Sequence, residues 1–231
     1  MQGVPAGMID KMKTAVYSGS FNPLHIGHLA IIRHMIEKAG FDMVYLIVSP
    51  KNPLKDGISS ASGQSRYDAA VEAVNRHFGT PFGGAECVED MPPPARGCLT
   101  EGKAGVLVTS GSPESRVKVD DIELNMPEPH YTIRTLDALR RREPENTFTF
   151  IMGADNLADI RRWRDYSRIL KEFGVAVFPR EGHDLTKIKQ DLLEEDPAYK
   201  IQIVDAPLVT VSSTQLREAL AKGEDISHLL M

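Results

Sequence analysis

The sequence has little of what marks several common protein classes. Its two cysteines, Cys87 and Cys98, have neither CxxC spacing nor a nearby histidine cluster, so a zinc site is not expected and a reduced cytosolic setting fits best. No apolar run approaches the roughly 18 residues of a membrane span, and the first twelve residues lack the apolar middle of a signal peptide. Lysine and arginine (27) are outnumbered by aspartate and glutamate (32), so nothing suggests binding to a nucleic-acid backbone. We therefore expect a cytoplasmic protein that acts on small molecules.

What is present indicates an α/β protein. The 231 residues, 42% of them hydrophobic, suffice for one large core. Apolar runs that predict strands alternate with amphipathic patterns that predict helices, and this alternation is typical of an open, doubly wound parallel sheet that binds its ligand outside the carboxyl ends of the strands. The expected strands are 14–18, 43–49, 147–152, 175–178 and 201–204, and the expected helices are 27–39, 64–78, 132–142, 157–172, 185–194 and 213–222.

Two segments stand outside this alternation. Residues 79–116 are rich in glycine and proline, with three consecutive prolines at 92–94, and we interpret them as an insertion within a single domain that spans 13–231. Residues 1–12 have no periodic pattern, and we expect a disordered or dispensable leader. Nothing in the sequence indicates an oligomeric state.

The stretch from Ser18 to His28, SGSFNPLHIGH, predicts a phosphate-binding turn. It follows the apolar run at 15–17, and its small residues let the backbone approach an anion closely. The first N–H groups of the following helix have no intrahelical partner, so they point at a bound anion. His25 and His28 share one face of that first turn, where both can donate to one polyphosphate, and Pro23 helps to fix the turn ahead of them.

A second such stretch, SSTQLR, runs from Ser212 to Arg217. Hydroxyl residues are common as ordinary helix caps, but three in succession with an arginine one turn later are typical of an anion site. In a doubly wound sheet the first and last loops can meet across the switch point. The two helix starts are therefore expected to bind a single triphosphate.

These two stretches together resemble the nucleotidyltransferase superfamily, whose members carry an HxGH motif and a late SSTxxR motif. Within it, the sequence is most similar to bacterial nicotinate-nucleotide adenylyltransferases, and the stretches 49–55, 130–136 and 150–157 with Trp163 support this narrower resemblance. The family implies a Rossmann-like nucleotidyltransferase fold. The sequence departs from the family in the length of 79–116, which precedes a strand corresponding to 117–124.

The resemblance also implies a reaction. Nicotinate mononucleotide attacks the α-phosphorus of ATP in line, without a covalent intermediate, and gives nicotinate adenine dinucleotide and pyrophosphate in NAD biosynthesis. Mg²⁺ would be carried with ATP, and no metal site on the protein is expected. The implied catalytic residues are His25, His28 and Arg217. The other implied ATP-binding residues are Gly19, Ser20, Phe21, Gly153, Asp155, Ser212, Ser213 and Thr214. The implied mononucleotide-binding residues are Asn22, Lys51, Asn52, Lys55, Tyr131, Thr132, Trp163 and Arg180.

Structural roles are open for some of these residues. Asp155 could cap a helix that starts near Leu157, Trp163 could anchor its helix in the core, and 51–55 could be a plain solvated loop. The arginines that follow Asp155 are expected on the wet face of the helix at 157–172.

Other functions also remain open. His-Ile-Gly-His occurs in class I aminoacyl-tRNA synthetases, but the small size, the acidic balance and the lack of a Lys-Met-Ser-Lys-Ser loop argue against them. Sibling transferases act on pantetheine phosphate, typically with threonine in place of His25, or on nicotinamide mononucleotide. A nucleotide sensor would bind ATP without releasing pyrophosphate, and it would not need the intact His25, His28 and Arg217.

Overall fold

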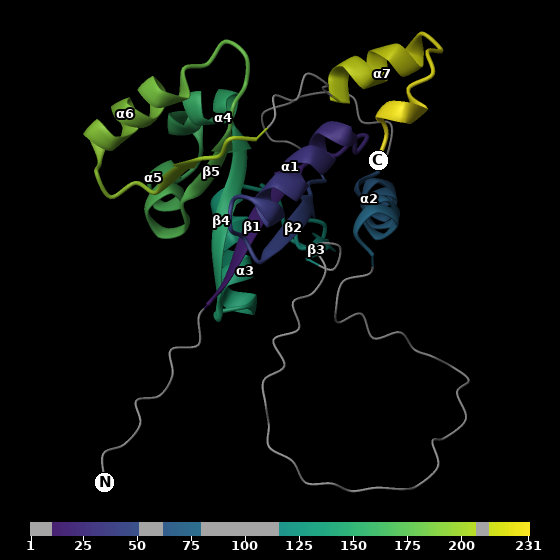
Figure 1. The fold of residues 1–231 in the computed structure, drawn as a ribbon. Coiled ribbons are helices and arrows are strands. Elements are labelled where there is room, and N and C mark those ends of the chain that lie inside the picture. The colour runs from purple at the N-terminus through teal and green to yellow at the C-terminus, as the bar shows by residue number, and fades with distance from the viewer. Residues whose placement is uncertain (1–10, 51–61, 80–115, 207–212) are drawn as a thin grey trace, which may run out of the picture.

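The computed structural model describes residues 11–50, 62–79, 116–206 and 213–231 of the chain. In this part of the chain, six parallel strands form one sheet with helices on both of its faces (Figure 1). The strands are β1 (Met12–Gly19), β2 (Met43–Val48), β3 (Val117–Asp120), β4 (Asn146–Gly153), β5 (Val175–Phe178) and β6 (Ile201–Ile203). The helices are α1 (Ile26–Glu37), α2 (Gly63–Phe78), α3 (Thr132–Arg142), α4 (Ala154–Ala158), α5 (Tyr166–Arg168), α6 (Leu185–Glu195) and α7 (Ser213–Ala221).

The strand order across the sheet is β3-β2-β1-β4-β5-β6, which confirms the doubly wound fold expected from the sequence. The order reverses between β1 and β4, because β1 pairs with β2 on one side and with β4 on the other. Gly19, at the end of β1, lies opposite Val48, at the end of β2. The loops that follow β1 and β4 therefore flank the switch point, where ligands bind in folds of this kind.

The core forms two apolar layers because successive strand residues point to opposite faces of the sheet. Ala15 and Tyr17 of β1 pack in one layer with α1 and α2, whereas Val16 packs in the other with α3, α4 and α6. The central strands are buried on both faces, which explains why they read as continuous apolar runs in the sequence. This packing holds the carboxyl ends of the strands in fixed positions.

The expected helix over 157–172 is wrong. The chain forms the short helix α4, a 3-10 turn at Ile160–Arg162, α5, and a π turn at Ile169–Phe173. Asp165 has a left-handed backbone (φ 51°), which an α-helix cannot contain, so the chain turns there and returns to the core at Ile169. The arginines of this region therefore do not line one helix face. They contact separate carboxylates, and Arg161, for example, pairs with Glu195.

The two unusual segments lie almost wholly outside the described residues. Met12, expected to end the leader, is the first residue of β1 and pairs with Asn146 of β4. Residues 1–10 and 80–115 lie outside the described part of the chain. No helix among the described residues is long and apolar enough to cross a membrane.

Candidate active site

The loop after β1 turns sharply at Phe21. This residue has a left-handed backbone (φ 42°), which bulky side chains rarely adopt, and its ring is buried against Tyr17 and His28 at centroid distances of 5.5 and 5.2 Å. A Cβ at Gly19 would lie 3.2 Å from the Phe21 ring, closer than a side chain there normally comes. Glycine at position 19 thus lets the Phe21 ring pack close to the end of β1, where it also contacts the His28 ring.

The rings of the two histidines of the first motif lie against each other, with centroids 3.8 Å apart and planes tilted by 38°. His25 is the N-cap of α1, where its Nδ1 accepts the N–H of Gly27 at 3.2 Å, and Nδ1 of His28 accepts the backbone N–H of His25 at 3.2 Å. An Nδ1 that accepts a hydrogen bond carries no proton, so each neutral ring is protonated at Nε2. The backbone thereby sets the tautomer in which both rings can donate through Nε2.

Both imidazoles are held in the neutral form. His25 is only 3% exposed, and this burial, with a smaller effect from the positive charge of Arg180, lowers its pKa from 6.5 to about 4. Burial also places the pKa of His28 well below its usual value, and the neighbouring His25 and Arg180 act in the same direction. At neutral pH the pair therefore offers hydrogen-bond donors without positive charge.

The first and last motifs meet in the structure. Arg217, in α7, donates from Nη1 to the backbone oxygen of Asn22 at 2.8 Å, although the two residues are 195 positions apart in the chain. Ser213 and Thr214 are the first residues of α7, and Ser212 lies outside the described residues. The guanidinium of the late motif thus lies at the loop that carries the histidines.

Gly153, Asp155 and Arg180 gather at the loop after β4. Gly153 is the N-cap of α4, so Asp155 lies within the first turn of that helix and does not cap one at Leu157. Nε of Arg180 is 3.9 Å from Oδ1 of Asp155, and a Cβ at Gly153 would collide with that oxygen and lie 3.2 Å from the same Nε. The positive charge of Arg180 also lowers the pKa of both histidines, so it acts on the loop after β1 as well as on Asp155.

The remaining residues expected at the site are spread more widely. Tyr131, 37% exposed, and Thr132 form the N-terminus of α3, which begins beyond the carboxyl end of β3. The Trp163 ring is half-buried against Phe150, with a centroid distance of 5.8 Å, and packs on the core layer under α3 and α4. Lys51, Asn52 and Lys55 lie outside the described residues.

Sequence reasoning missed three residues at this edge. Tyr17 contacts the rings of His28 and Phe178, at centroid distances of 5.9 and 6.4 Å. Glu123 is buried and accepts hydrogen bonds from Thr135 and Ser18, at 2.8 and 3.4 Å. Arg66 is buried and donates to Ser20. In the sequence each occupies an ordinary strand, loop or helix position, so no local signal could have identified it.

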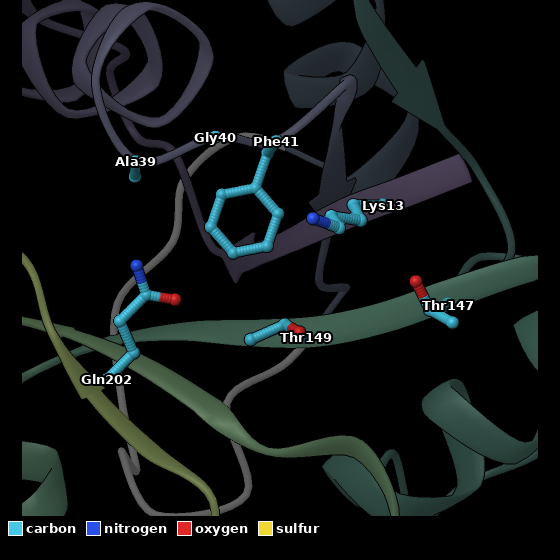
Figure 2. A pocket seen from close by; sticks show the side chains of 7 residues that line it. All are labelled: Lys13, Ala39, Gly40, Phe41, Thr147, Thr149 and Gln202. Carbon is cyan, nitrogen blue, oxygen red and sulfur yellow. The ribbon is translucent and has the colours of Figure 1, made fainter. Parts of the chain in front are cut away.

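A separate hollow of about 460 Å³ opens at the other end of the sheet, near the amino-terminal halves of β1 and β4 (Figure 2). Its lining is mixed and mostly polar: Lys13, Ala39, Gly40, Phe41, Thr147, Thr149 and Gln202. Ligands of parallel α/β sheets bind at the carboxyl ends of the strands. The candidate site is therefore the carboxyl edge of the sheet, where the two motifs lie, and not this hollow. Among the described residues there is no group of three or more His, Cys, Asp or Glu side chains that could hold a metal ion.

Comparison with known proteins agrees with this geometry. Residues 16–219 match the model of the Cytidylyltransferase-like family. A protein of Flavobacterium johnsoniae named probable nicotinate-nucleotide adenylyltransferase is 32% identical over 95% of this chain and 92% of its own length, and one of Bacteroides fragilis with the same name is 33% identical over 95% and 88%. The solved Plasmodium falciparum nicotinic acid mononucleotide adenylyltransferase complexed with NaAD has the same fold (TM-score 0.65, 18% identity), with 94% of this chain and 88% of that chain covered.

Proposed function

The chain belongs to the cytidylyltransferase-like family, and from this premise we propose how its residues carry out the reaction. It is a nicotinate-nucleotide adenylyltransferase, a nucleotidyltransferase of NAD biosynthesis that joins the adenylyl group of ATP to nicotinate mononucleotide. We propose that a phosphate oxygen of the mononucleotide forms a bond to the α-phosphorus of ATP. At the same time the bond breaks between the α-phosphorus and the oxygen that bridges it to the β-phosphate. Pyrophosphate then leaves with the electron pair of that bond, and no covalent intermediate forms.

The triphosphate is proposed to lie between the first turns of α1 and α7. There the Nε2–H groups of His25 and His28, the Arg217 guanidinium, and the backbone N–H groups and hydroxyls at 212–214 would donate to its oxygens. Charge grows on the leaving pyrophosphate, so donors that are already in place stabilise the transition state more than the ground state. Mg²⁺ would arrive as part of the MgATP substrate and need few protein ligands.

The other parts of the two substrates follow the carboxyl edge of the sheet. The adenosine is proposed to lie near Gly153, whose lack of a Cβ lets the side chains of Asp155 and Arg180 lie close to the backbone, and the Asp155 carboxylate can accept from ribose hydroxyls. Arg180, which the family resemblance implies for the mononucleotide, lies 3.9 Å from Asp155, and we propose that it binds where the two substrates adjoin. Gly19, Ser20 and Phe21 would form the wall beside the phosphates.

The mononucleotide is proposed to occupy the half of the edge beyond the β1 loop. Lys51, Asn52 and Lys55 would bind its phosphate, together with Asn22. Tyr131, Thr132 and Trp163 would surround the pyridine ring, although the packing of Trp163 against Phe150 is also what a core anchor would show. A cytoplasmic location is part of the proposal, since both substrates are small polar nucleotides.

The hydrogen bond from Arg217 to the Asn22 carbonyl carries this proposal, because it brings the two phosphate-binding stretches to one place. The test is pyrophosphate release by the purified protein with MgATP and, in parallel, nicotinate mononucleotide, nicotinamide mononucleotide or pantetheine phosphate. We expect the nicotinate form to react fastest. Equal rates with the first two acceptors would contradict the preference for the acid, and ATP binding without release of pyrophosphate in the presence of any of the acceptors would indicate a sensor.

A further inference from the structure

Arg66 is a buried cation at the base of the candidate active site. It lies in the first turn of α2, and only 4% of its surface is exposed. Its guanidinium donates to three backbone carbonyls: Nη1 to the oxygens of Ser20 and Ser49, at 2.6 and 2.8 Å, and Nη2 to that of Pro50, at 2.8 Å.

The three acceptors belong to two different loops. Ser20 is the residue after β1 and begins the loop that ends at His25. Ser49 and Pro50 follow β2 and lead into the stretch at 51–55 that we propose for the mononucleotide phosphate. The N–H of Ser49 also donates to the Gly19 carbonyl at 2.9 Å, so the two strand ends already touch. The Arg66 side chain then joins the loops just beyond that contact.

Burying the positive charge of Arg66 costs free energy that a hydrogen bond from a neutral side chain would not cost. Burial lowers the pKa of the Arg66 guanidinium, although arginine remains protonated at neutral pH. Within the described ranges, no carboxylate lies within ion-pairing distance of it. Three backbone carbonyls accept from the two Nη atoms without cancelling the charge, and the buried Nε has no hydrogen-bond partner among the described residues.

A guanidinium also suits this position because of its shape. Its planar fork presents donors in fixed directions, and here two of its nitrogens reach three acceptors on two loops. A lysine ammonium is a single point on a flexible stem and cannot fix the same three oxygens with one geometry. The guanidinium of Arg66 therefore bonds to the loops after β1 and β2 and also fixes the distance between them.

We propose that Arg66 is a positioning residue that fixes the spacing between the ATP loop after β1 and the mononucleotide loop after β2. This inference rests on the proposed function, which places one substrate on each loop. In-line transfer needs the attacking oxygen and the α-phosphorus in a near-attack geometry, and a misplacement of about 1 Å can slow such a step about a hundredfold. Arg66 touches neither substrate, and it acts through the two loops.

This role predicts a specific kinetic pattern. Without Arg66 each loop can still bind its own substrate, so the Kd of MgATP should change by less than about threefold, whereas kcat should fall by about 10- to 100-fold. Arg66→Lys keeps the charge but loses the fork, so its kcat should lie between those of the wild type and Arg66→Ala. Added guanidinium should re-enter the space left in Arg66→Ala and restore activity several-fold.

The experiment compares the wild type, Arg66→Ala, Arg66→Lys and the control Arg76→Ala. Arg76 lies on the same helix, but it is exposed, and its one ion pair among the described residues is with Glu72 in the preceding turn. Circular dichroism and thermal melting measure the folded fraction, titration measures MgATP binding, and steady-state pyrophosphate release gives kcat and KM. Guanidinium chloride at low, non-denaturing concentration is compared with sodium chloride at equal ionic strength. We expect guanidinium to restore kcat in Arg66→Ala alone.

Three outcomes would overturn the inference: a kcat within threefold of the wild type in folded Arg66→Ala, a loss that resides wholly in MgATP binding, or a loss explained by the unfolded fraction. If Arg66→Ala does not fold, Arg66→Lys decides, and wild-type kcat in that variant overturns the inference. Failure of the proposed function looks different, because the wild type itself would then release no pyrophosphate.

Discussion

Acidification should lower the free energy of unfolding through protonation of His25, and the contacts of His25 explain why. The neutral ring carries its proton on Nε2, so an added proton must go to Nδ1 and break the bond from Gly27 N–H that caps α1. The folded pKa is about 4 and the ordinary value is 6.5, so the unfolded chain takes up the proton first as the pH falls. The stabilisation is complete above the unfolded pKa and is lost as the pH falls toward the folded one. The gap between 6.5 and about 4 corresponds to about 3 kcal/mol of unfolding free energy.

The assay is a series of urea unfolding curves without nucleotide, between about pH 8 and pH 4, on the wild type and two variants. His25→Asn keeps a good N-cap acceptor but cannot titrate, and His183→Asn removes an exposed histidine as the control. Carboxylates titrate in all three proteins, so their effects largely cancel in the differences, whereas the difference for His25→Asn includes the coupling of His25 to His28. The wild type and His183→Asn should each lose about 3 kcal/mol more than His25→Asn over this range. Parallel curves for the wild type and His25→Asn would refute the burial argument.

Two substitutions at the site give further predictions. His28→Ala removes one donor to the leaving pyrophosphate, so kcat should fall by about 10² or more in a protein that still folds, and unchanged turnover would remove this histidine from the mechanism. Gly153→Ala introduces a Cβ that displaces the Asp155 carboxylate, so MgATP should bind about tenfold more weakly in titration, a loss of about 1.4 kcal/mol of binding free energy. Wild-type affinity in that variant would place the adenosine elsewhere.

The fold could be predicted largely from the sequence because buried parallel strands show as apolar runs. The strand expected at 175–178 and the helix at 132–142 coincide with the observed β5 and α3, and the other expected strands differ from the observed ones by a few residues at their ends. The prediction of one helix over 157–172 was wrong for a local reason. Asp165 adopts a left-handed conformation that tertiary packing imposes, and neither glycine nor proline marks the break in the sequence.

The motifs of the site could be recognised, but their electrostatics could not. The proximity of His25 to Arg217 follows from the family resemblance, and the Asn22 contact agrees with it. The neutral, Nε2-protonated state of the histidines depends on burial and on backbone donors, and only the folded chain shows these. Arg66 shows the same limit, since its partner loops are up to 46 positions away in the sequence.

The charge balance of the site bears on how the product leaves. In the nucleotide-free chain both imidazoles are neutral, so the positive charge that the described residues place at this edge comes from Arg217, Arg180 and the buried Arg66, and Mg²⁺ would be added by the substrate. Neutral donors still stabilise the charge that develops on pyrophosphate, because hydrogen bonds aimed at an anion strengthen as that charge grows. Before ATP binds, burial keeps both rings neutral, but the negative charge of a bound polyphosphate raises the pKa of an adjacent imidazole, so the charge of the rings in the loaded site depends on the ligand as well as on burial. When pyrophosphate leaves, that negative charge leaves with it, and burial again favours the neutral rings.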